Sequence, residues 1–183
     1  MTSRFVLPVR EDVDLVLRER WTAESMHRLA VANIDRLRAW EPWAQGEQTL
    51  AALVAFDRLQ LLDWVDGRCV PTSIRYRGEL VGTISARIDP YHRTAELGYW
   101  IDAGAEGHGL VTACGEVLRD HVVAAYRVAR LEIRAAVRNR RSRAVAERLG
   151  FTHEGTLRAA LPVGADRHDI AVYGFVPTST PDD

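Results

Sequence analysis

Two glycines stand directly before an apolar-periodic segment in the stretch AEGHGLVTACG, which covers residues 105–115. Glycine lets a backbone approach a ligand closely, and the first turn of a helix offers unpaired N–H groups and a partial positive charge. Gly107 and Gly109 at the start of a helix therefore indicate an anion site, typically one for phosphate. A tight turn without a ligand is the alternative explanation when the two glycines are taken alone.

Two common nucleotide-binding patterns fit these glycines poorly. A P-loop requires Gly-Lys-Ser/Thr before its helix, and the sequence holds no such triplet. A dinucleotide-binding turn is closer, because GHGLVT supplies Gly-x-Gly, but the third glycine, which permits close helix–strand packing, is missing. The acid that such a fold places at the end of its next strand is missing too, since Glu132 lies early in that strand.

Four arginines surround the start of another predicted helix in RNRRSR, residues 138–143. Helix N-termini favour acidic side chains, so this cluster indicates either a solvated basic face or guanidinium groups that approach phosphates. Asn139 is placed to cap the helix, and Ser142 follows one helical turn later. RNA binding is disfavoured, because no aromatic side chains are interleaved with the arginines.

The elements that must position these residues follow from apolar spacing and turn signals. Helices are expected at about 22–37, 49–64, 110–126 and 141–149, with Thr49 as an N-cap and Gly150 as a C-terminal stop. Strands are expected within 4–18, on both sides of a turn around 77–79, at 94–101, at 129–137, and on both sides of Gly164. This order favours one α/β or α+β domain with a mixed sheet.

Composition narrows the class of protein. The 183 residues suffice for one domain with a sizeable core, and 47% hydrophobic and 27% charged residues are ordinary for a globular protein. A formal net charge of −1 provides no basic field for nucleic acid or membrane lipid, and no apolar run approaches the roughly 20 residues of a membrane span. Two cysteines without metal-ligand spacing, and an N-terminus without a secretory signal pattern, predict a cytoplasmic protein without a metal site.

Four segments, in this order along the chain, carry a resemblance to a known family. LRAWEPWA holds a Trp-x-Pro-Trp segment, and ELGYWIDAGAEGHGLVTACGEVL leads through the glycine loop. RLEIRAAVRNRRSRAVAERLGFTHEGTLR holds Asn-x-x-Ser followed by Leu-Gly-Phe and Glu-Gly, and HDIAVYGF closes the series. Together, from about residue 10 to 176, they resemble the GNAT N-acetyltransferase superfamily and its RimJ/RimL branch, in which Gln/Arg-x-x-Gly-x-Gly/Ala cradles the pyrophosphate of acetyl-CoA.

The resemblance implies a single GNAT domain over residues 1–176, with residues 177–183 as a flexible tail. Its fold is an α/β (α+β) arrangement: a mixed, mostly antiparallel sheet of about seven strands, with splayed central strands and flanking helices. It also implies an acetyl-CoA-dependent N-acetyltransferase that transfers acetyl directly to a primary amine, on a protein N-terminus or a small molecule, without a metal. Homodimers are common in this branch, so a homodimer is expected.

The resemblance assigns the acetyl-CoA site to backbone groups at the end of the strand TAELGYWI, to the glycine loop and helix start, and to the start of the next helix. The residues concerned are Trp100, Ile101, Gly107, His108, Gly109, Leu110, Val111, Thr112, Asn139 and Arg143.

Acetylation of an amine by a thioester sets three demands. The amine must lose a proton, the thioester oxygen needs a hydrogen-bond donor, and the departing thiolate needs a proton. Strand alternation puts Glu96, Gly98 and Trp100 on one face, which makes Glu96 the predicted base or water anchor. The alternative for Glu96 is an ion pair with a neighbouring arginine. By the resemblance, Ser142 protonates the thiolate, and a second helix cap is its alternative.

The acceptor amine is expected on the side of the Trp-x-Pro-Trp segment. Trp40 and Trp43 are predicted to line this side, and His168 and Asp169 to reach the acceptor's ammonium group. Two tryptophans around a proline fit a plug in the core equally well. If they close a deep pocket, a small-molecule acceptor is favoured, whereas a wide cleft favours a protein N-terminus.

Four positions depart from the family pattern. Glu106 stands where the family carries Gln or Arg, so its carboxylate must turn away from a bound pyrophosphate. His108 replaces a frequent Lys or Arg, and Val111 replaces the last Gly/Ala. Leu161 lies near the position of a glutamate base in ribosomal-protein acetyltransferases. Glu106 and Leu161 raise an alternative function, a non-catalytic acyl-CoA-binding or regulatory module with the same fold.

Overall fold

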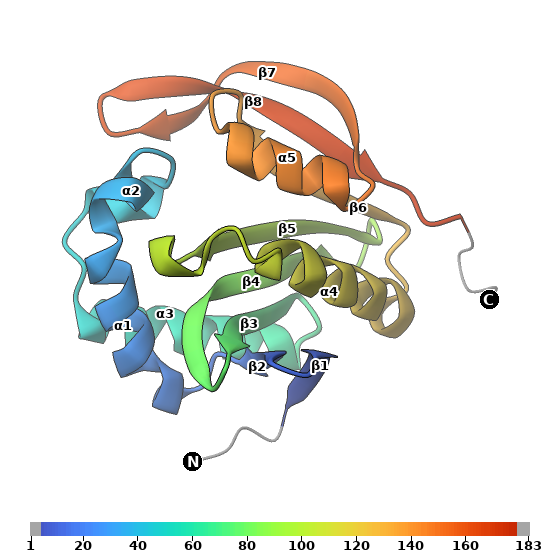
Figure 1. Cartoon of the computed structure of the whole chain (residues 1–183). Helices are drawn as coiled ribbons and strands as arrows, with labels where there is room; N and C mark the ends of the chain where they lie inside the picture. The colour runs from blue at the N-terminus through green and yellow to red at the C-terminus, as the bar shows by residue number, and fades with distance from the viewer. Residues whose placement is uncertain (1–4, 179–183) are drawn as a thin grey trace.

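Eight strands form one sheet, in the order β1-β2-β3-β4-β5-β6-β8-β7, in the computed structural model, which describes residues 5–178 (Figure 1). Neighbouring strands are antiparallel except β5 and β6, which are parallel. The strands are β1 (Val6–Arg10), β2 (Val13–Leu17), β3 (Cys69–Tyr76), β4 (Glu79–Asp89), β5 (Thr94–Ile101), β6 (Arg130–Ala136), β7 (Thr152–Val163) and β8 (Asp166–Phe175).

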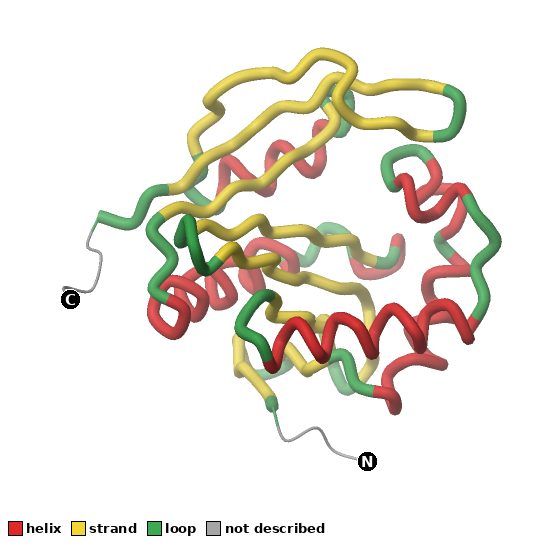
Figure 2. Tube along the Cα trace, turned by 180° about the vertical axis from the view of Figure 1, so that it is seen from behind, coloured by secondary structure: helices red, strands yellow, loops and turns green. Residues whose placement is uncertain are grey.

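Helices cover both faces of this sheet. Helix α4 lies on one face, and α3 lies on the opposite face with α1 beside it (Figures 1 and 2). The α-helices are α1 (Ala23–Ala32), α2 (Ile34–Arg38), α3 (Leu50–Val65), α4 (Leu110–Tyr126) and α5 (Arg140–Arg148). Short 3₁₀ helices cover Arg20–Thr22, Pro42–Gln45 and Ala103–Ala105. Within residues 5–178, every helix is too short or too polar to traverse a lipid bilayer.

The predicted fold class is confirmed, with differences at two elements and one untested segment. The N-terminal extended piece is a hairpin of two strands, β1 and β2, which brings the described part of the sheet to eight strands instead of about seven. The helix predicted over 22–37 is divided at Asn33 into α1 and α2. Of the predicted tail, residues 179–183 lie outside the described residues, so its flexibility stays a prediction.

Local sequence explains the elements that were predicted closely. The Thr49 hydroxyl accepts a hydrogen bond from the backbone N–H of Ala52 at 3.1 Å, which caps α3. Arg77 and Gly78 connect β3 to β4 with φ angles of 51° and 86°. A two-residue hairpin turn of this kind requires positive φ at both positions, which Gly78 adopts without strain.

The central strands separate part-way along their length, as the resemblance implies. Strands β5 and β6 pair only where residues 94–96 lie opposite residues 130–132. Beyond these pairs, residues 97–101 of β5 and 133–136 of β6 diverge (Figure 1). The edge of β5 that faces β6 therefore offers backbone hydrogen-bonding groups that have no strand partner.

Helix α4 packs an apolar stripe against the sheet and also supports α5. Leu110, Cys114, Leu118 and Val122 are buried at intervals of four residues along α4. At Gly115, an added Cβ would lie 2.8 Å from a methyl carbon of Leu149, the C-cap residue directly after α5. The missing side chain lets α5 approach α4 closely, and this packing fixes the two helices whose N-termini border the site.

Candidate active site

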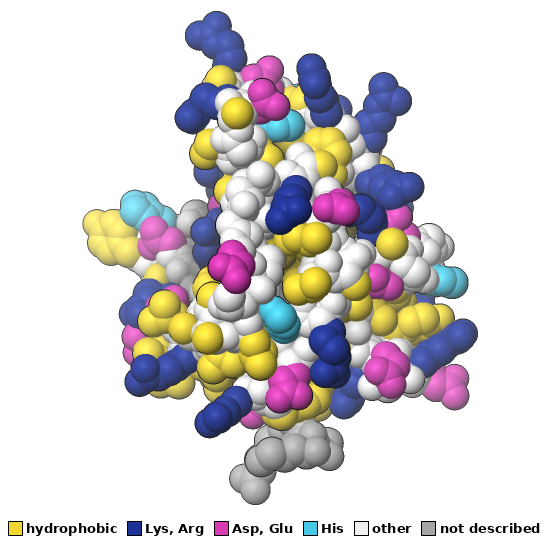
Figure 3. All heavy atoms as spheres, turned by 90° about the vertical axis from the view of Figure 1, so that its left-hand side faces the viewer, with side chains coloured by type: hydrophobic (Ala, Val, Ile, Leu, Met, Phe, Trp, Pro, Cys, Tyr) yellow, Lys and Arg dark blue, Asp and Glu magenta, His cyan; other side chains and the backbone are white. Residues whose placement is uncertain are grey.

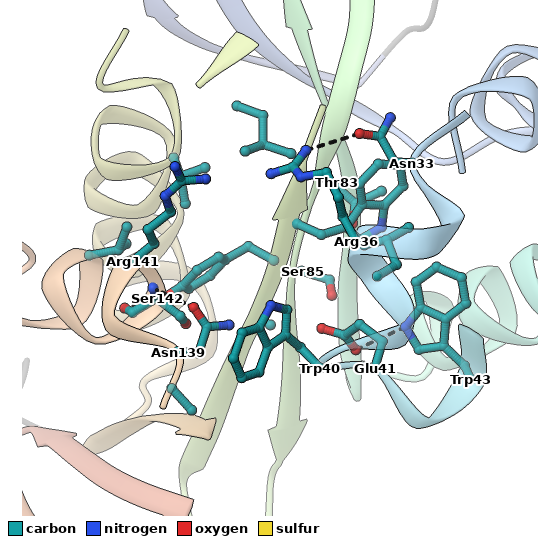
Figure 4. Close-up of a pocket in the computed structure, with 18 of the residues that line it drawn as sticks. Asn33, Arg36, Trp40, Glu41, Trp43, Thr83, Ser85, Asn139, Arg141 and Ser142 are labelled. Atoms are coloured by element: carbon teal, nitrogen blue, oxygen red, sulfur yellow. Dashed lines mark hydrogen bonds between the residues drawn. The ribbon is translucent and has the colours of Figure 1, made fainter. Parts of the chain in front are cut away.

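A large cavity opens where β5 and β6 separate (Figure 4). Its volume is about 2140 Å³, well above the roughly 300–1,000 Å³ of typical small-molecule sites. Residues from α1, α2, α3, β4, β5 and β7 line it, together with the first turns of α4 and α5. A space of this size accommodates an extended ligand and part of a second one.

The glycine loop forms the N-terminus of α4, as predicted. Gly107 and Gly109 have φ angles of 82° and 69°, and Gly109 is the N-cap of the 17-residue helix. Among residues 5–178, no atom would come within 4 Å of a Cβ added at either glycine. Leu110, Val111 and Thr112 line the cavity, and their N–H groups belong to the first turn. The loop therefore presents unpaired donors and the positive end of the helix dipole to the cavity.

Asn33, at the break between α1 and α2, holds the segment that leads into this loop. It is 3% exposed, and its amide nitrogen donates to Asp102 Oδ1 at 2.6 Å. Its amide oxygen accepts a hydrogen bond from the backbone N–H of Ala103 at 3.1 Å, while Asp102 Oδ2 accepts from Gly104 N at 3.0 Å. The helical layer thus fixes the loop through one buried amide, a role that sequence analysis missed.

Glu106, directly before the glycine loop, lies between two arginines. Arg36 of α2 and Arg141 of α5 both form ion pairs with its carboxylate, with Arg141 Nη1 at 2.5 Å from Oε2. All three residues line the cavity. These pairs balance a negative charge that stands beside the anion-binding turn. The expectation that Glu106 turns away from a bound pyrophosphate stays a prediction.

Tyr99 and Ser142 form a hydrogen-bonded pair across the divergence of the strands. The Tyr99 hydroxyl lies 3.0 Å from Ser142 Oγ and donates to the Ser142 carbonyl oxygen at 2.9 Å. Burial raises the pKa of Tyr99 to about 12, so this hydroxyl is protonated at neutral pH. Asn139 Oδ1 accepts from Ser142 N at 3.1 Å, which confirms Asn139 as the N-cap of α5. Ser142 thus places its hydroxyl beside Tyr99 at the cavity wall.

The other face of β5 carries Glu96, Gly98 and Trp100, which all line the cavity. Glu96 forms ion pairs with Arg87 of β4 at 3.0 Å and Arg134 of β6 at 3.9 Å. The structure therefore has the ion-paired arrangement that was the alternative for this residue. A role of Glu96 as base or water anchor stays a prediction, and a proton on its carboxylate would weaken both ion pairs.

Residues 40–43 bring two indole rings and a carboxylate to the acceptor side (Figure 4). The rings of Trp43 and Trp100 have centroids 6.5 Å apart, and those of Trp40 and His168 are 6.2 Å apart. Trp43 Nε1 donates to Glu41 Oε2 at 2.9 Å. Trp43 is 44% exposed and Trp40 is half-buried. The two tryptophans therefore border an open cavity instead of plugging the core.

Two residues predicted to bind acetyl-CoA lie outside the lining of this cavity. Arg143 Nε donates to the Tyr173 hydroxyl at 2.9 Å, and its Nη1 donates to the carbonyl oxygen of Val137 at 3.3 Å. The ring of His108 packs against Tyr76, with centroids 5.8 Å apart. Binding of acetyl-CoA by these two residues stays a prediction, and the backbone of His108 belongs to the glycine loop.

The two residues predicted to reach the acceptor's ammonium group lie in the β7–β8 hairpin. His168 and Asp169 border a separate cavity of about 330 Å³. Asp169 Oδ1 accepts a hydrogen bond from the backbone N–H of Ala159 at 2.7 Å, where β7 shifts its register against β8. Asp169 thus has a structural contact, and only His168 approaches the acceptor side, through Trp40.

Within the described residues, neither the two cysteines nor the side chains of metal-ligating type provide a further reactive group. Cys69 and Cys114 are buried, and burial raises their thiol pKa values to about 11 and about 12. Both are therefore thiols at neutral pH and poor nucleophiles. Within the part of the chain that the structure describes, no group of three or more His, Cys, Asp or Glu residues could hold a metal ion.

Sequence analysis missed Glu41 and Tyr99 as cavity residues, although each left a signal. Glu41 stands inside the Trp-x-Pro-Trp segment, in which only the two tryptophans were predicted to line the acceptor side. The alternation that placed Glu96 on one face of β5 also places Tyr99 on the other. Leu161 lines the cavity as well, with a side chain that accepts no proton.

Comparison with known proteins gives a consistent match. The acetyltransferase (GNAT) domain family matches residues 10–152. YdaF of Bacillus subtilis (strain 168), which carries the provisional name of a ribosomal N-acetyltransferase, is 33% identical over 177 residues. That alignment covers 94% of this chain and 95% of YdaF.

Two solved structures share the fold along almost the whole chain. RimL, a ribosomal L7/L12 α-N-protein acetyltransferase in complex with coenzyme A, matches with a TM-score of 0.91 and 25% identity over 94% of this chain and 98% of that one. The microcin C7 self-immunity acetyltransferase MccE, in complex with acetyl-CoA and AMP, matches with a TM-score of 0.88 and 26% identity over 92% and 94% of the two chains.

Proposed function

The chain belongs to the acetyltransferase (GNAT) family and is an acetyl-CoA-dependent N-acetyltransferase, and we propose that its acceptor is the α-amino group of a protein N-terminus. The observation that carries this proposal is the openness of the acceptor side. Trp40 and Trp43 border the cavity, and Trp43 is 44% exposed. A peptide end can enter such an opening while the rest of its chain stays outside.

The relatives and the surface support the same acceptor class. RimL is named as a ribosomal L7/L12 α-N-protein acetyltransferase, and YdaF carries the provisional name of a ribosomal N-acetyltransferase. The molecular face over α1 and α2 mixes arginines with acidic side chains and apolar groups, without one dominant charge (Figure 3). An α-amino group, with a pKa near 8, also needs less help to lose its proton than a lysine side chain, with a pKa near 10.4.

The residues of the cavity fit acetyl-CoA as the acetyl donor. The open left-handed glycines and the first turn of α4 offer N–H groups to the pyrophosphate. The unpaired edge of β5, residues 97–101, offers hydrogen-bonding groups to the amides of the pantetheine arm and to the acetyl oxygen. Acetyl-CoA supplies the thioester, whose C–S bond breaks as the amine nitrogen bonds to the acetyl carbon.

Ser142 and Tyr99 are the pair that we assign to the leaving group. The Ser142 hydroxyl gives its proton to the sulfur that departs from the acetyl carbon. Tyr99, bonded to Ser142 Oγ at 3.0 Å and protonated at neutral pH, then restores the serine proton and regains its own from solvent. Because Cys69 and Cys114 are buried thiols, the acetyl group passes directly to the amine, without an acyl-enzyme.

Location and assembly are part of the proposal. A ribosomal-type acceptor and acetyl-CoA are both met in the cytoplasm, so we assign the protein there. A homodimer is expected from the family, and sedimentation velocity of the purified chain tests it. The non-catalytic alternative raised by Glu106 and Leu161 is not favoured, because the family and its named relatives are acetyltransferases.

The acceptor class is tested with two matched peptides that differ in their N-terminus and in one internal residue. The first has a free N-terminal serine and no lysine, and the second has an acetylated N-terminus and one internal lysine. Both are incubated with acetyl-CoA and the chain, and acetylation is followed by mass spectrometry. The proposal predicts acetylation of the first peptide only, and faster acetylation of the lysine peptide would contradict it. Ethanolamine as a third acceptor distinguishes a small-molecule enzyme.

A further inference from the structure

The acceptor arrives as an ammonium group, which must lose a proton before its nitrogen can attack. Carboxylates are the candidate bases, and the lining of the cavity includes four of them: Glu41, Glu47, Glu96 and Glu106. These four differ in partners and exposure, and the differences select one.

Two of the four already neutralise arginines. Glu96 pairs with Arg87 and Arg134, and Glu106 pairs with two further guanidinium groups from α2 and α5. A proton taken up by either carboxylate would cost these ion pairs. Glu47 is exposed, beyond the 3₁₀ helix that carries Trp43, and bulk water surrounds it.

Glu41 is the remaining carboxylate, and its surroundings suit proton transfer. It is half-buried, and within residues 5–178 no ion pair joins it to a cation. Among the described residues, its carboxylate accepts one hydrogen bond, from Trp43 Nε1 to Oε2, which leaves Oε1 for a substrate. Burial raises the pKa of Glu41, and the hydrogen bond from Trp43 opposes this only in part. A raised pKa makes a carboxylate a stronger base.

The position of Glu41 relates it to the strand that leads to the thioester site. In Figure 4 its carboxylate points between the two indoles toward Ser85 of β4. Ser85 pairs with Gly98 of β5, and a Cβ added at Gly98 would meet no atom of the described residues within 4 Å. Trp43 in turn lies against Trp100, two residues further along β5. The open space over Gly98 therefore lies between Glu41 and the end of β5.

We propose that Glu41 is the catalytic base that accepts a proton from the acceptor's ammonium group over Gly98. Trp40 and Trp43 lie on either side of it (Figure 4), and the Nε1 edge of Trp43 holds the carboxylate in place. The Trp-Glu-Pro-Trp segment then supplies two aromatic side chains and a carboxylate between them. Its Pro42 has a fixed φ that begins the 3₁₀ helix.

The proton balance of this step is simple. Oε1 of Glu41 takes one proton from the ammonium group, and the neutral nitrogen forms the C–N bond while the C–S bond breaks. The nitrogen then loses its second proton to water, because Glu41 already holds the first, and the thiolate takes one from Ser142. This role rests on the transfer to an amine described above, but not on which amine it is.

Other titratable groups line the same cavity and are the competing bases. His27 of α1 binds the carbonyl oxygen of Gln48 through Nε2 at 3.0 Å. Tyr99 of β5 is bonded to Ser142 and is protonated at neutral pH. Four arginines of the lining form ion pairs with Glu96 or Glu106: Arg36, Arg87, Arg134 and Arg141. The lining also contains Arg18, Arg138, Arg140 and Arg148.

The test is the pH dependence of kcat/KM for Glu41→Gln, Glu41→Asp and, as the matched control, Glu47→Gln. For the unaltered chain, kcat/KM falls as pH decreases through the pKa of the base, because only the deprotonated carboxylate accepts a proton. Glu41→Gln should lower kcat/KM at pH 7 by about 10²- to 10³-fold. It should also replace the acid limb of the carboxylate by one at the higher pKa of the acceptor amine, because the rate then follows the free-amine fraction. Glu41→Asp should recover part of the rate, and Glu47→Gln should match the unaltered chain.

Calorimetric titration with acetyl-CoA separates this role from a folding defect, since its Kd should change less than twofold in Glu41→Gln. Retention of the carboxylate's acid limb in Glu41→Gln, or a loss of rate that is equal at every pH, overturns the proposal and moves the role to His27 or water. The acceptor in this assay is whichever of the peptides or ethanolamine the unaltered chain acetylates. A wrong acceptor class therefore leaves this test intact.

Discussion

The carboxylate of Glu106 gives the clearest prediction about cofactor affinity. It stands directly before Gly107, where a bound pyrophosphate would meet the first turn of α4, and two arginines hold it there. We expect Glu106→Gln to bind acetyl-CoA more tightly than the unaltered chain. The substitution keeps the size of the side chain, removes its charge, and frees Arg36 and Arg141 to pair with phosphate oxygens.

The magnitude follows from exposure and distance. The side chains of Arg36 and Arg141 are 42% and 79% exposed, so each pair with Glu106 is worth at most about 1 kcal/mol. Repulsion between the carboxylate and one nearby phosphate charge at the protein surface is on the order of 1 kcal/mol, and it falls with distance. Removal of this repulsion should lower the Kd of acetyl-CoA about fivefold. If the freed arginines also pair with phosphate oxygens, the total decrease in Kd should be about tenfold.

Isothermal titration calorimetry at two salt concentrations measures this effect. The control is Glu116→Gln, which removes the same charge from an exposed position further along α4, outside the cavity lining. The gain in affinity should appear only in Glu106→Gln and should shrink at high salt, because ions screen exposed charges. Weaker binding by Glu106→Gln would refute the reasoning, since it would mean that Glu106 orders the loop more than it repels the ligand.

Three further predictions concern the acceptor face, the leaving group and the fold. Gly98→Leu should fill the open space over β5 and lower kcat/KM for the acceptor at least about tenfold, with acetyl-CoA affinity by calorimetry unchanged. Ser142→Ala and Tyr99→Phe should each lower kcat, and their double mutant should lose less than the product of the two, because they act as one proton path. Asp57→Ala should leave the guanidinium of Arg18 buried without its partner, and urea denaturation should show a loss of about 3–5 kcal/mol.

The elements that sequence predicted closely are those with a local physical cause. Strand β5 and helix α4 have the bounds expected from alternation and from the glycines before residue 110. Thr49 starts α3 and Gly78 turns the β3–β4 hairpin, because capping and positive φ depend on residues next to each other in the chain.

The parts that sequence analysis missed depend on contacts between distant segments. The break at Asn33 makes sense only once its amide meets Asp102 and Ala103, 69 and 70 residues further along the chain. In the sequence, Glu106 is an unexplained negative charge beside a phosphate-binding loop. The structure shows that Arg36 and Arg141, from distant parts of the chain, form ion pairs with it.

Contacts between distant segments also decide which of the two candidate bases, Glu41 or Glu96, is favoured. Glu96 was predicted from alternation along its own strand, which says nothing about the arginines that the neighbouring strands bring to it. Glu41 acquires its half-buried environment from the way the segment after α2 folds over the cavity. Periodicity identifies a face of an element, and only the packed structure tells which partners that face meets.

Direct transfer of acetyl from acetyl-CoA to an α-amino group is the central claim, and one labelling measurement tests it. The chain, isotopically labelled acetyl-CoA and a peptide with a free N-terminal serine are mixed, quenched at intervals and analysed by intact mass. The chain has 24 arginines and no lysine, so its own side chains contribute no lysine background. Direct transfer predicts one label on the peptide N-terminus and none on the chain at any time. Label that appears on the chain before the peptide, or a peptide that stays unlabelled while acetyl-CoA binds, would contradict it.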